Sequence, residues 1–186
     1  MTTKTTSKSK ESSTEASLRH SLRKITYNDA VILLETLRKL YYEPDTSLEL
    51  KGIITKTLAK NVLYVLSENH LANYVSEDAL KLWRDNDLTS KIKIGELKKL
   101  SVSKQRSKKK NFPVLKELIL EHSNPLLELV NLIFDEKKDI RYILEHELIT
   151  TWITKDENGN LNKKYKSSRP GGWEKCYEEY NIIVRD

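Results

Sequence analysis

Apolar residues recur at the spacing of an amphipathic helix over much of the chain. The first such stretch covers about residues 27–41 and directly follows Thr26, which forms a variant of the capping box with Asp29. After the break at Pro44, a second amphipathic stretch covers about residues 50–67. The first part of the chain therefore predicts two helices.

The pattern after these two stretches predicts further helices and one β element. Ser76 precedes acidic residues and is placed to cap a helix, and the residue before Pro125 marks a helix boundary because it avoids the α conformation. The β-branched and aromatic run 148–154 predicts a strand, and the Asn-Gly signal within residues 156–160 predicts a hairpin returning through residues 161–165. The predicted helices cover about residues 77–83, 114–121, 125–134, 135–147 and 173–180.

These elements predict a mainly α fold, a helical domain with a small β-strand or hairpin element near the C-terminus. Residues 1–18 are Thr, Ser, Lys and Glu with almost nothing to bury, so they are predicted to form a disordered tail. Residues 19–186 are predicted to form a single domain with a basic loop at about residues 101–111. A chain of 186 residues has room for one ordinary core.

The composition argues against several classes of protein. No apolar run approaches the roughly 18 residues of a membrane-spanning helix, and the N-terminal residues lack the apolar core of a secretory signal. Cys176 is the only cysteine, so the chain can form neither an internal disulfide nor a cysteine-rich zinc site. We therefore expect a cytoplasmic protein with no membrane partner.

The positive charge is concentrated in one segment, residues 91–110, called the basic segment below. The formal net charge of the chain is +6, yet this segment alone holds nine basic residues and one acid, Glu96, a local charge of +8. The nine residues are Lys91, Lys93, Lys98, Lys99, Lys104, Arg106, Lys108, Lys109 and Lys110. Such a segment can neutralise several phosphates and release their counterions. The sequence therefore predicts a nucleic-acid-binding protein, with DNA favoured and the phosphate contacts largely nonspecific.

A second interpretation of the basic segment remains open, because positive charge also suits an acidic protein surface. The chain would then be a non-enzymatic interaction or inhibitor protein that docks on a host nucleoprotein complex. Its preference for Lys, Ile, Leu and Asn, with few Ala or Gly, is typical of a low-GC bacterium, so we expect a phage or mobile-element origin. The sequence leaves the choice between DNA and RNA and the oligomeric state open.

Three residues loosely resemble the motif of HNH nucleases, in which a histidine activates water and other residues hold a divalent metal. The order His122, Asn131, His146 carries the resemblance. It implies that His122 is the base, that Asn131 orients it and that His146 is a ligand. A divalent metal would then be the cofactor, and without this chemistry no cofactor is expected. The departure is that the family places its first histidine on a β-hairpin, whereas the flanks of His122 predict helices. An ordinary helix C-terminus at His122 is the alternative.

Arg141 and His146 fit the Arg-x4-His spacing of HEPN ribonucleases. This resemblance implies metal-free RNA cleavage by a dimer, in which the arginine holds phosphate and the histidine moves a proton. The alternative is a solvent-facing Arg141 and a His146 packed beside the strand.

The C-terminal part also resembles a group of small uncharacterised bacterial and phage proteins, beginning at a Glu-His-x-x-Pro-Leu segment that is itself loosely HNH-like. The matching residues are Glu121 to Leu126, Ile153 to Asn158, Arg169-Pro170, Tyr180 and Ile182. The resemblance implies one C-terminal unit and assigns no activity to it.

Overall fold

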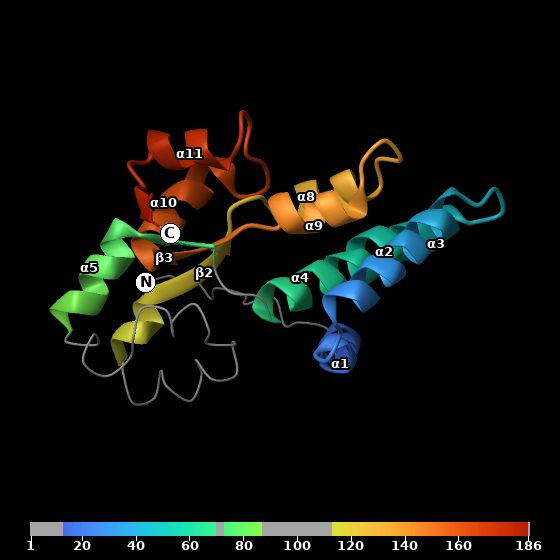
Figure 1. The fold of residues 1–186 in the computed structure, drawn as a ribbon, viewed down its shortest axis with the longest axis horizontal. Helices are drawn as coiled ribbons and strands as arrows, with labels where there is room; N and C mark the ends of the chain where they lie inside the picture. Colours follow the sequence, from blue (N-terminus) through green and yellow to red (C-terminus); the bar gives the residue numbers. More distant parts are fainter. Residues whose placement is uncertain (1–12, 70–72, 87–112, 186) are drawn as a thin grey trace, which may run out of the picture.

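The chain folds into two regions that lie side by side along the long axis of the molecule (Figure 1). The computed structural model describes residues 13–69, 73–86 and 113–185. Helices predominate, and a small four-stranded sheet completes the fold, so the predicted fold class is confirmed. Within the described residues, none of the helices combines the length and apolar character that a membrane crossing requires.

The first region, called the helical region, is built around one large cluster of buried apolar side chains. It consists of α1 (Ser13–Leu22), α2 (Tyr27–Tyr42), α3 (Leu48–Ile53), the π-helical turn η1 (Ile54–Ala59), α4 (Lys60–Asn69), α8 (Leu126–Ile133) and α9 (Ile140–His146). The predicted capping box of α2 is confirmed, because Thr26 accepts from the Asp29 amide and the Asp29 carboxylate accepts from the Thr26 amide. The predicted stretch 50–67 lies within one run of helix that contains η1.

The second region, called the sheet region, is built on β1 (Tyr74–Ser76), β2 (Leu118–His122), β3 (Thr150–Thr154) and β4 (Val184–Arg185). The strand order is β2-β3-β1-β4, so β2 is an edge strand. β1 runs parallel to β3, and the other two pairs are antiparallel. The predicted strand at 148–154 is confirmed as β3.

Four further elements pack around this sheet: α5 (Glu77–Asp85), the 3-10 helix η2 (Pro113–Glu117), α10 (Lys155–Tyr165) and α11 (Trp173–Glu179). Ser76 caps α5 as predicted, accepting from the Ala79 amide at 3.1 Å. Two apolar clusters form here, one around Trp83 and Trp152 and one around Tyr177 and Ile153. Because α8 and α9 lie between β2 and β3 in the sequence yet pack with α2 and α4, the chain passes between the two regions three times, from α4 to β1, from β2 to α8 and from α9 to β3.

Two predicted elements are wrong because pairing and capping override local signals. Residues 114–121 are not a helix but η2 followed by β2, whose Leu120 faces Trp152 in the ladder with β3. Pairing with a buried strand outweighs the helical preference of Leu and Glu. Residues 155–165 are not a hairpin but α10, because Thr154 and Glu157 form a second capping box that outweighs the Asn-Gly turn signal.

Two predicted boundaries also differ from the structure. Residues 1–12 lie outside the described residues, but the end of the predicted tail belongs to α1, which is anchored by Arg19 above the Tyr64 ring, 4.1 Å from its centroid. The helix predicted from Asp135 begins only at Ile140, where the Asp139 side chain accepts from the Tyr142 amide. The basic loop predicted at 101–111 lies outside the described residues.

Candidate functional site

All nine basic residues of the basic segment lie outside the described residues, but both flanks of the segment are described. The chain leaves α5 just after Trp83 and returns at η2 with Leu115. Both side chains are buried in the same apolar cluster, together with Leu118 of β2 and Trp152 of β3. The described residues on either side of the basic segment therefore pack in one cluster of the sheet region.

A cleft of about 860 Å³ lies between the two regions. It is bounded by η1 and the start of α4 on the helical side, by α8, by β2 and by α10. Four consecutive residues of β2, Ile119 to His122, line it. Because successive side chains of a strand point to opposite faces, this consecutive lining means that the cleft follows the open edge of the sheet.

Three lysines line the cleft, Lys56 and Lys60 from the helical region and Lys166 from the end of α10. None of them forms an ion pair with any residue in the described part of the chain. Other lysines of α10 behave differently: Lys155 pairs with Glu117 at 3.2 Å and Lys164 with Glu179 at 2.6 Å. The cleft thus holds positive charge that no neighbouring carboxylate neutralises.

The spacing of polar residues explains how two helices face the same cleft. Asn158, Asn162 and Lys166 follow one another at intervals of four residues and so share one face of the helical run. Asn162 Nδ2 donates to Asn158 Oδ1 at 2.9 Å. On the opposite side, Lys56 and Lys60 are four residues apart within the π-helical turn and the start of α4.

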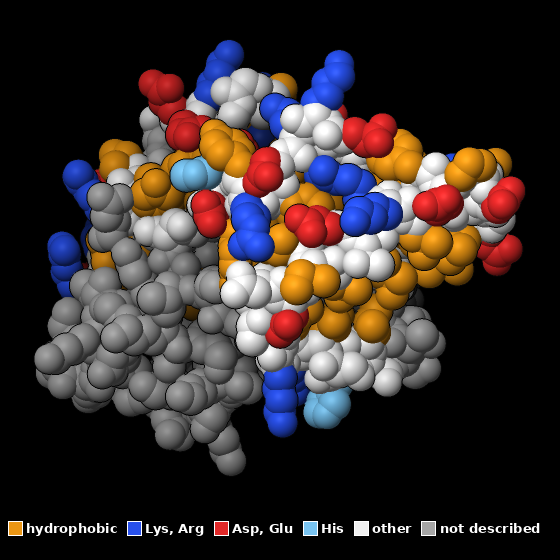
Figure 2. All heavy atoms as spheres, turned by 45° about the vertical axis from the view of Figure 1, so that its right-hand side comes forward, with side chains coloured by type: hydrophobic (Ala, Val, Ile, Leu, Met, Phe, Trp, Pro, Cys, Tyr) orange, Lys and Arg blue, Asp and Glu red, His pale blue; other side chains and the backbone are white. Residues whose placement is uncertain are grey.

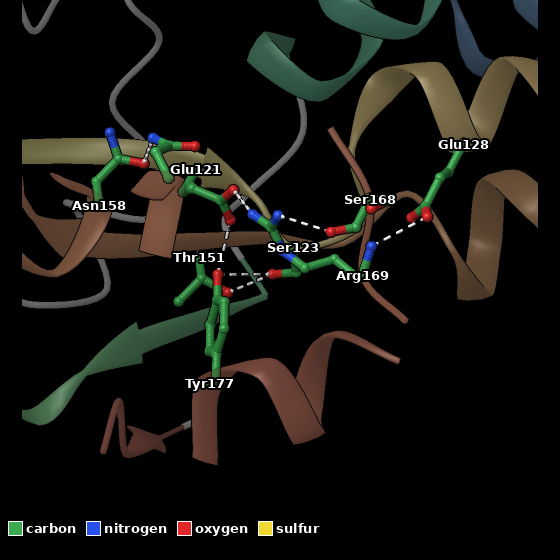
Figure 3. Close-up of polar contacts among 9 residues, drawn as sticks. Glu121, Ser123, Glu128, Thr151, Asn158, Ser168, Arg169 and Tyr177 are labelled. Carbon is green, nitrogen blue, oxygen red and sulfur yellow. Dashed lines mark hydrogen bonds and ion pairs between the residues drawn. The ribbon is translucent and has the colours of Figure 1, made fainter. Parts of the chain in front are cut away.

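Glu121 is the only acidic residue that lines the cleft among those the structure describes, and its carboxylate is already hydrogen-bonded (Figure 3). Its two oxygens accept from Arg169 Nη2 at 2.6 Å and from the Tyr177 hydroxyl at 2.7 Å. The exposed fraction is 1% for the Arg169 side chain and 11% for that of Glu121. This pair fastens β2 to the chain before α11 and to α11 itself.

The polar network continues behind Glu121, as the side chains in Figure 3 show. Ser123 Oγ lies 2.8 Å from Thr151 Oγ1 and 3.3 Å from the Tyr177 hydroxyl. Burial raises the pKa of Glu121 in spite of the opposing effects of Tyr177 and Arg169. Burial and the nearby Glu121 carboxylate raise the pKa of Tyr177, so its hydroxyl stays a donor.

His122 lines the cleft beside Glu121. Its Nε2 lies 2.7 Å from Ser67 Oγ, which also lies 2.7 Å from the Tyr64 carbonyl. The other ring nitrogen, Nδ1, has no hydrogen-bond partner among the described residues. Burial lowers the pKa of His122 to about 4, so the ring is neutral at neutral pH.

The structure brings together only some of the predicted catalytic residues. His122 lies on β2 rather than at a helix end, and it shares the cleft with Asn131 of α8. Arg141 and His146 are exposed on α9 and do not line this cleft. Arg141 Nη1 donates to Asn28 at 3.4 Å, and the His146 ring stacks on Tyr142 at a centroid distance of 4.5 Å, not beside the strand.

A metal site for the HNH-like arrangement does not assemble in the described part of the chain. No group of three or more His, Cys, Asp or Glu side chains there is placed to hold a metal ion. His122 could supply only one ligand. The two oxygens of Glu121 already accept hydrogen bonds, one from Arg169 and one from Tyr177. No mechanistic step through a metal follows from this geometry.

The segments that carry the resemblance to small bacterial and phage proteins meet around the cleft. Glu121 binds Arg169, and both Glu121 and Asn158 line the cleft. Tyr180 and Ile182 belong to the apolar cluster beneath α10 and α11. Comparisons with protein-family models, with curated proteins and with solved structures give no match. The chemistry of the cleft is therefore argued from this chain alone.

The cleft residues that sequence reasoning missed are Lys56, Lys60, Lys166, Asn158 and Asn162. A signal for three of them was present, because residues 158, 162 and 166 recur at helical spacing. This helical spacing was overlooked because the Asn-Gly signal led to the prediction of a hairpin through the same residues. For the two lysines near η1 no signal exists in the sequence, since their partner surface is more than fifty positions away along the chain.

Proposed function

We propose that this chain is a cytoplasmic nucleic-acid-binding protein whose basic segment contacts phosphates, with DNA as the favoured partner. The observation that carries the proposal is the local charge of +8 in a segment whose two flanks are anchored on one apolar cluster. The contacts are to phosphates and give little sequence preference.

The proposal is tested by replacing Lys108, Lys109 and Lys110 together with Gln and measuring affinity for duplex and single-stranded DNA over a range of salt. Each lost phosphate contact lowers the slope of log affinity against log salt by about 0.9 for duplex DNA. A matched control removes the same charge elsewhere, at Lys137 and Lys138 in the turn before α9 and at Lys39 of α2. Unchanged affinity and slope in the basic-segment variant would refute the proposal.

The same samples test for catalysis. Plasmid DNA and RNA are incubated with the protein, with and without Mg²⁺ or Mn²⁺. Metal-dependent DNA cutting that His122→Ala abolishes supports an HNH-like nuclease, and metal-free RNA cutting that His146→Ala abolishes supports a HEPN-like one. Without cutting, the chain is a binding protein.

A second candidate function, docking on a protein complex, is favoured by exposed apolar side chains where α2 meets α3. Figure 2 shows them at the right-hand end of the molecule, with acidic side chains among them. The exposed fraction is 89% for Leu48, and Leu40, Tyr42, Leu50 and Ile53 are also exposed. A surface of this kind suits a partner that is apolar and basic. This function predicts that wild type fails to bind free duplex at moderate salt, whereas the first function predicts binding.

A further inference from the structure

The cleft between the two regions offers three kinds of contact, and together they define a ligand. Lys56, Lys60 and Lys166 line it, and none of them forms an ion pair with another described residue. Along its wall are apolar side chains of β2 and α8, including Ile119, Leu126 and Val130. At its base and on α10 are neutral hydrogen-bonding groups.

The lysines match an anion with several oxygens. They line the cleft from two sides, two from the helical region and one from the sheet region. Glu121, the one carboxylate among the described residues that line the cleft, is neutralised by the buried Arg169 at 2.6 Å and does not oppose such an anion. Phosphate attracts lysine as a point charge and needs no planar pairing geometry.

The rest of the cleft suits a flat ring with hydrogen-bonding groups at its edge, such as a nucleobase. Apolar side chains supply the surface against which a base can lie, and Asn158 and Asn162 supply amide groups of the kind that pair with base edges. His122 adds Nδ1, the ring nitrogen that has no partner among the described residues, because Nε2 is already hydrogen-bonded to Ser67.

We propose that the cleft binds one nucleoside phosphate unit, with its phosphate held by Lys56, Lys60 and Lys166 and its base against β2, where His122 Nδ1 accepts from a base N–H. A volume of about 860 Å³ is within the range of small-molecule sites. A base reaches such a cleft as a free nucleotide or from a single strand, since in a duplex stacking covers the faces of the bases and pairing occupies their Watson–Crick edges. The site uses no residue of the basic segment, so it can exist whether or not that segment binds nucleic acid.

The experiment measures binding of AMP, GMP, CMP and UMP by isotope-edited NMR and calorimetry, with adenosine as the phosphate-free probe. At least one nucleotide is expected to shift the amide signals of Asn158, Asn162 and His122. The triple variant Lys56→Gln/Lys60→Gln/Lys166→Gln is expected to raise its Kd about tenfold and to leave adenosine binding unchanged. The control is the Lys39→Gln/Lys137→Gln/Lys138→Gln variant, which removes the same charge away from the cleft and should keep the wild-type Kd.

A second variant tests the base end of the site. His122→Phe keeps an aromatic ring in place and removes the acceptor, so it should weaken the binding of adenosine and of the nucleotides alike.

A short single-stranded oligonucleotide and its duplex then identify the source of the nucleoside phosphate unit. Tighter binding of the single strand points to a strand, and equal or weaker binding points to a free nucleotide. The proposal is overturned if no nucleotide shifts the cleft signals, or if the cleft and control variants lose affinity equally. Neither result depends on Lys108, Lys109 and Lys110.

Discussion

The two regions of the molecule are stabilised by different means. In the helical region, the core cluster is apolar throughout. In the sheet region, buried polar groups are part of the interior: of the eight buried polar residues in the described chain, Asn61 and Ser67 lie on α4, and the other six lie on or next to the sheet elements. The six are Ser76, Ser123, Asn124, Thr150, Thr151 and Arg169.

This difference has a structural cause. Amphipathic helices can bury an apolar face while the backbone groups between their two ends are hydrogen-bonded within the helix. Strands as short as β1 and β4 form few hydrogen bonds with their neighbours. Side chains such as Glu121 and Arg169 therefore help to hold the sheet and the following segments in position. The cleft lies where the two kinds of packing meet, and its base is a part of the polar network.

Breaking the buried ion pair should give the largest effect. Arg169→Met leaves the Glu121 carboxylate buried without its cation, and the free energy of unfolding should fall by about 3 to 5 kcal/mol. Urea denaturation measures this loss. The matched control is Arg185→Met, whose pair with Glu77 is exposed and should contribute at most about 1 kcal/mol.

A double variant distinguishes an uncompensated charge from lost packing. Glu121→Gln/Arg169→Met removes the buried charge and keeps an acceptor for Tyr177, so it should recover much of the stability that Arg169→Met loses. If the double variant is as unstable as the single one, the pair acts mainly through packing.

The apolar core of the helical region should respond to Leu34→Ala, because Leu34 is fully buried on α2. Creating this cavity should cost about 2 to 5 kcal/mol. All three tryptophans lie in the sheet region, so tryptophan fluorescence follows that region, whereas far-UV circular dichroism follows mainly the helices. Because α8 and α9 link the regions, both signals should shift to the same lower midpoint. Separate midpoints would show that the regions unfold independently.

His122 lies at the boundary between the two regions, and its protonation should make the free energy of unfolding depend on pH. Its pKa is about 4 in the folded protein and about 6.5 when unfolded, so the unfolded state binds more protons between these values. Stability should therefore fall by about 3 kcal/mol as the pH drops from 6.5 to 4. The loss should be absent in His122→Phe and retained in His146→Gln, in which an exposed histidine is changed. Denaturation midpoints across this pH range provide the measurement.

The sequence predicts elements that carry a complete local signal. The capping box at Thr26, the Ser76 cap and the β-branched run of β3 each contain their own evidence within a few residues, and all three predictions are confirmed. β1 and β4 carry no such signal because they are three and two residues long and exist only through pairing, such as Val75 with Trp152.

The candidate site was less predictable than the fold, for a similar reason. His122 and Asn131 were singled out by type and order, and the structure places both at one cleft. The third member of that motif, His146, lies elsewhere because α9 packs on α2 and turns its exposed face away. Which lysines face a cleft depends on contacts between distant segments, and no local pattern encodes those contacts.

The smallest changes in stability are expected for substitutions in the two capping boxes, one of which lies in each region. Thr26→Ala and Thr154→Ala each remove one acceptor at a helix N-terminus and should each cost about 1 kcal/mol. The two helices should differ at the acidic partner. Asp29 is exposed, whereas Glu157 also accepts from the Ser76 hydroxyl at 2.8 Å, and Ser76 is fully buried.

Glu157→Ala should therefore destabilise the protein more than Asp29→Ala, because it leaves a buried hydroxyl of β1 without its acceptor as well as opening the box. Thermal melts of the four single variants provide the comparison. Equal losses for Glu157→Ala and Asp29→Ala would mean that the Ser76 contact adds nothing, and that the sheet region depends on its polar network only around Glu121.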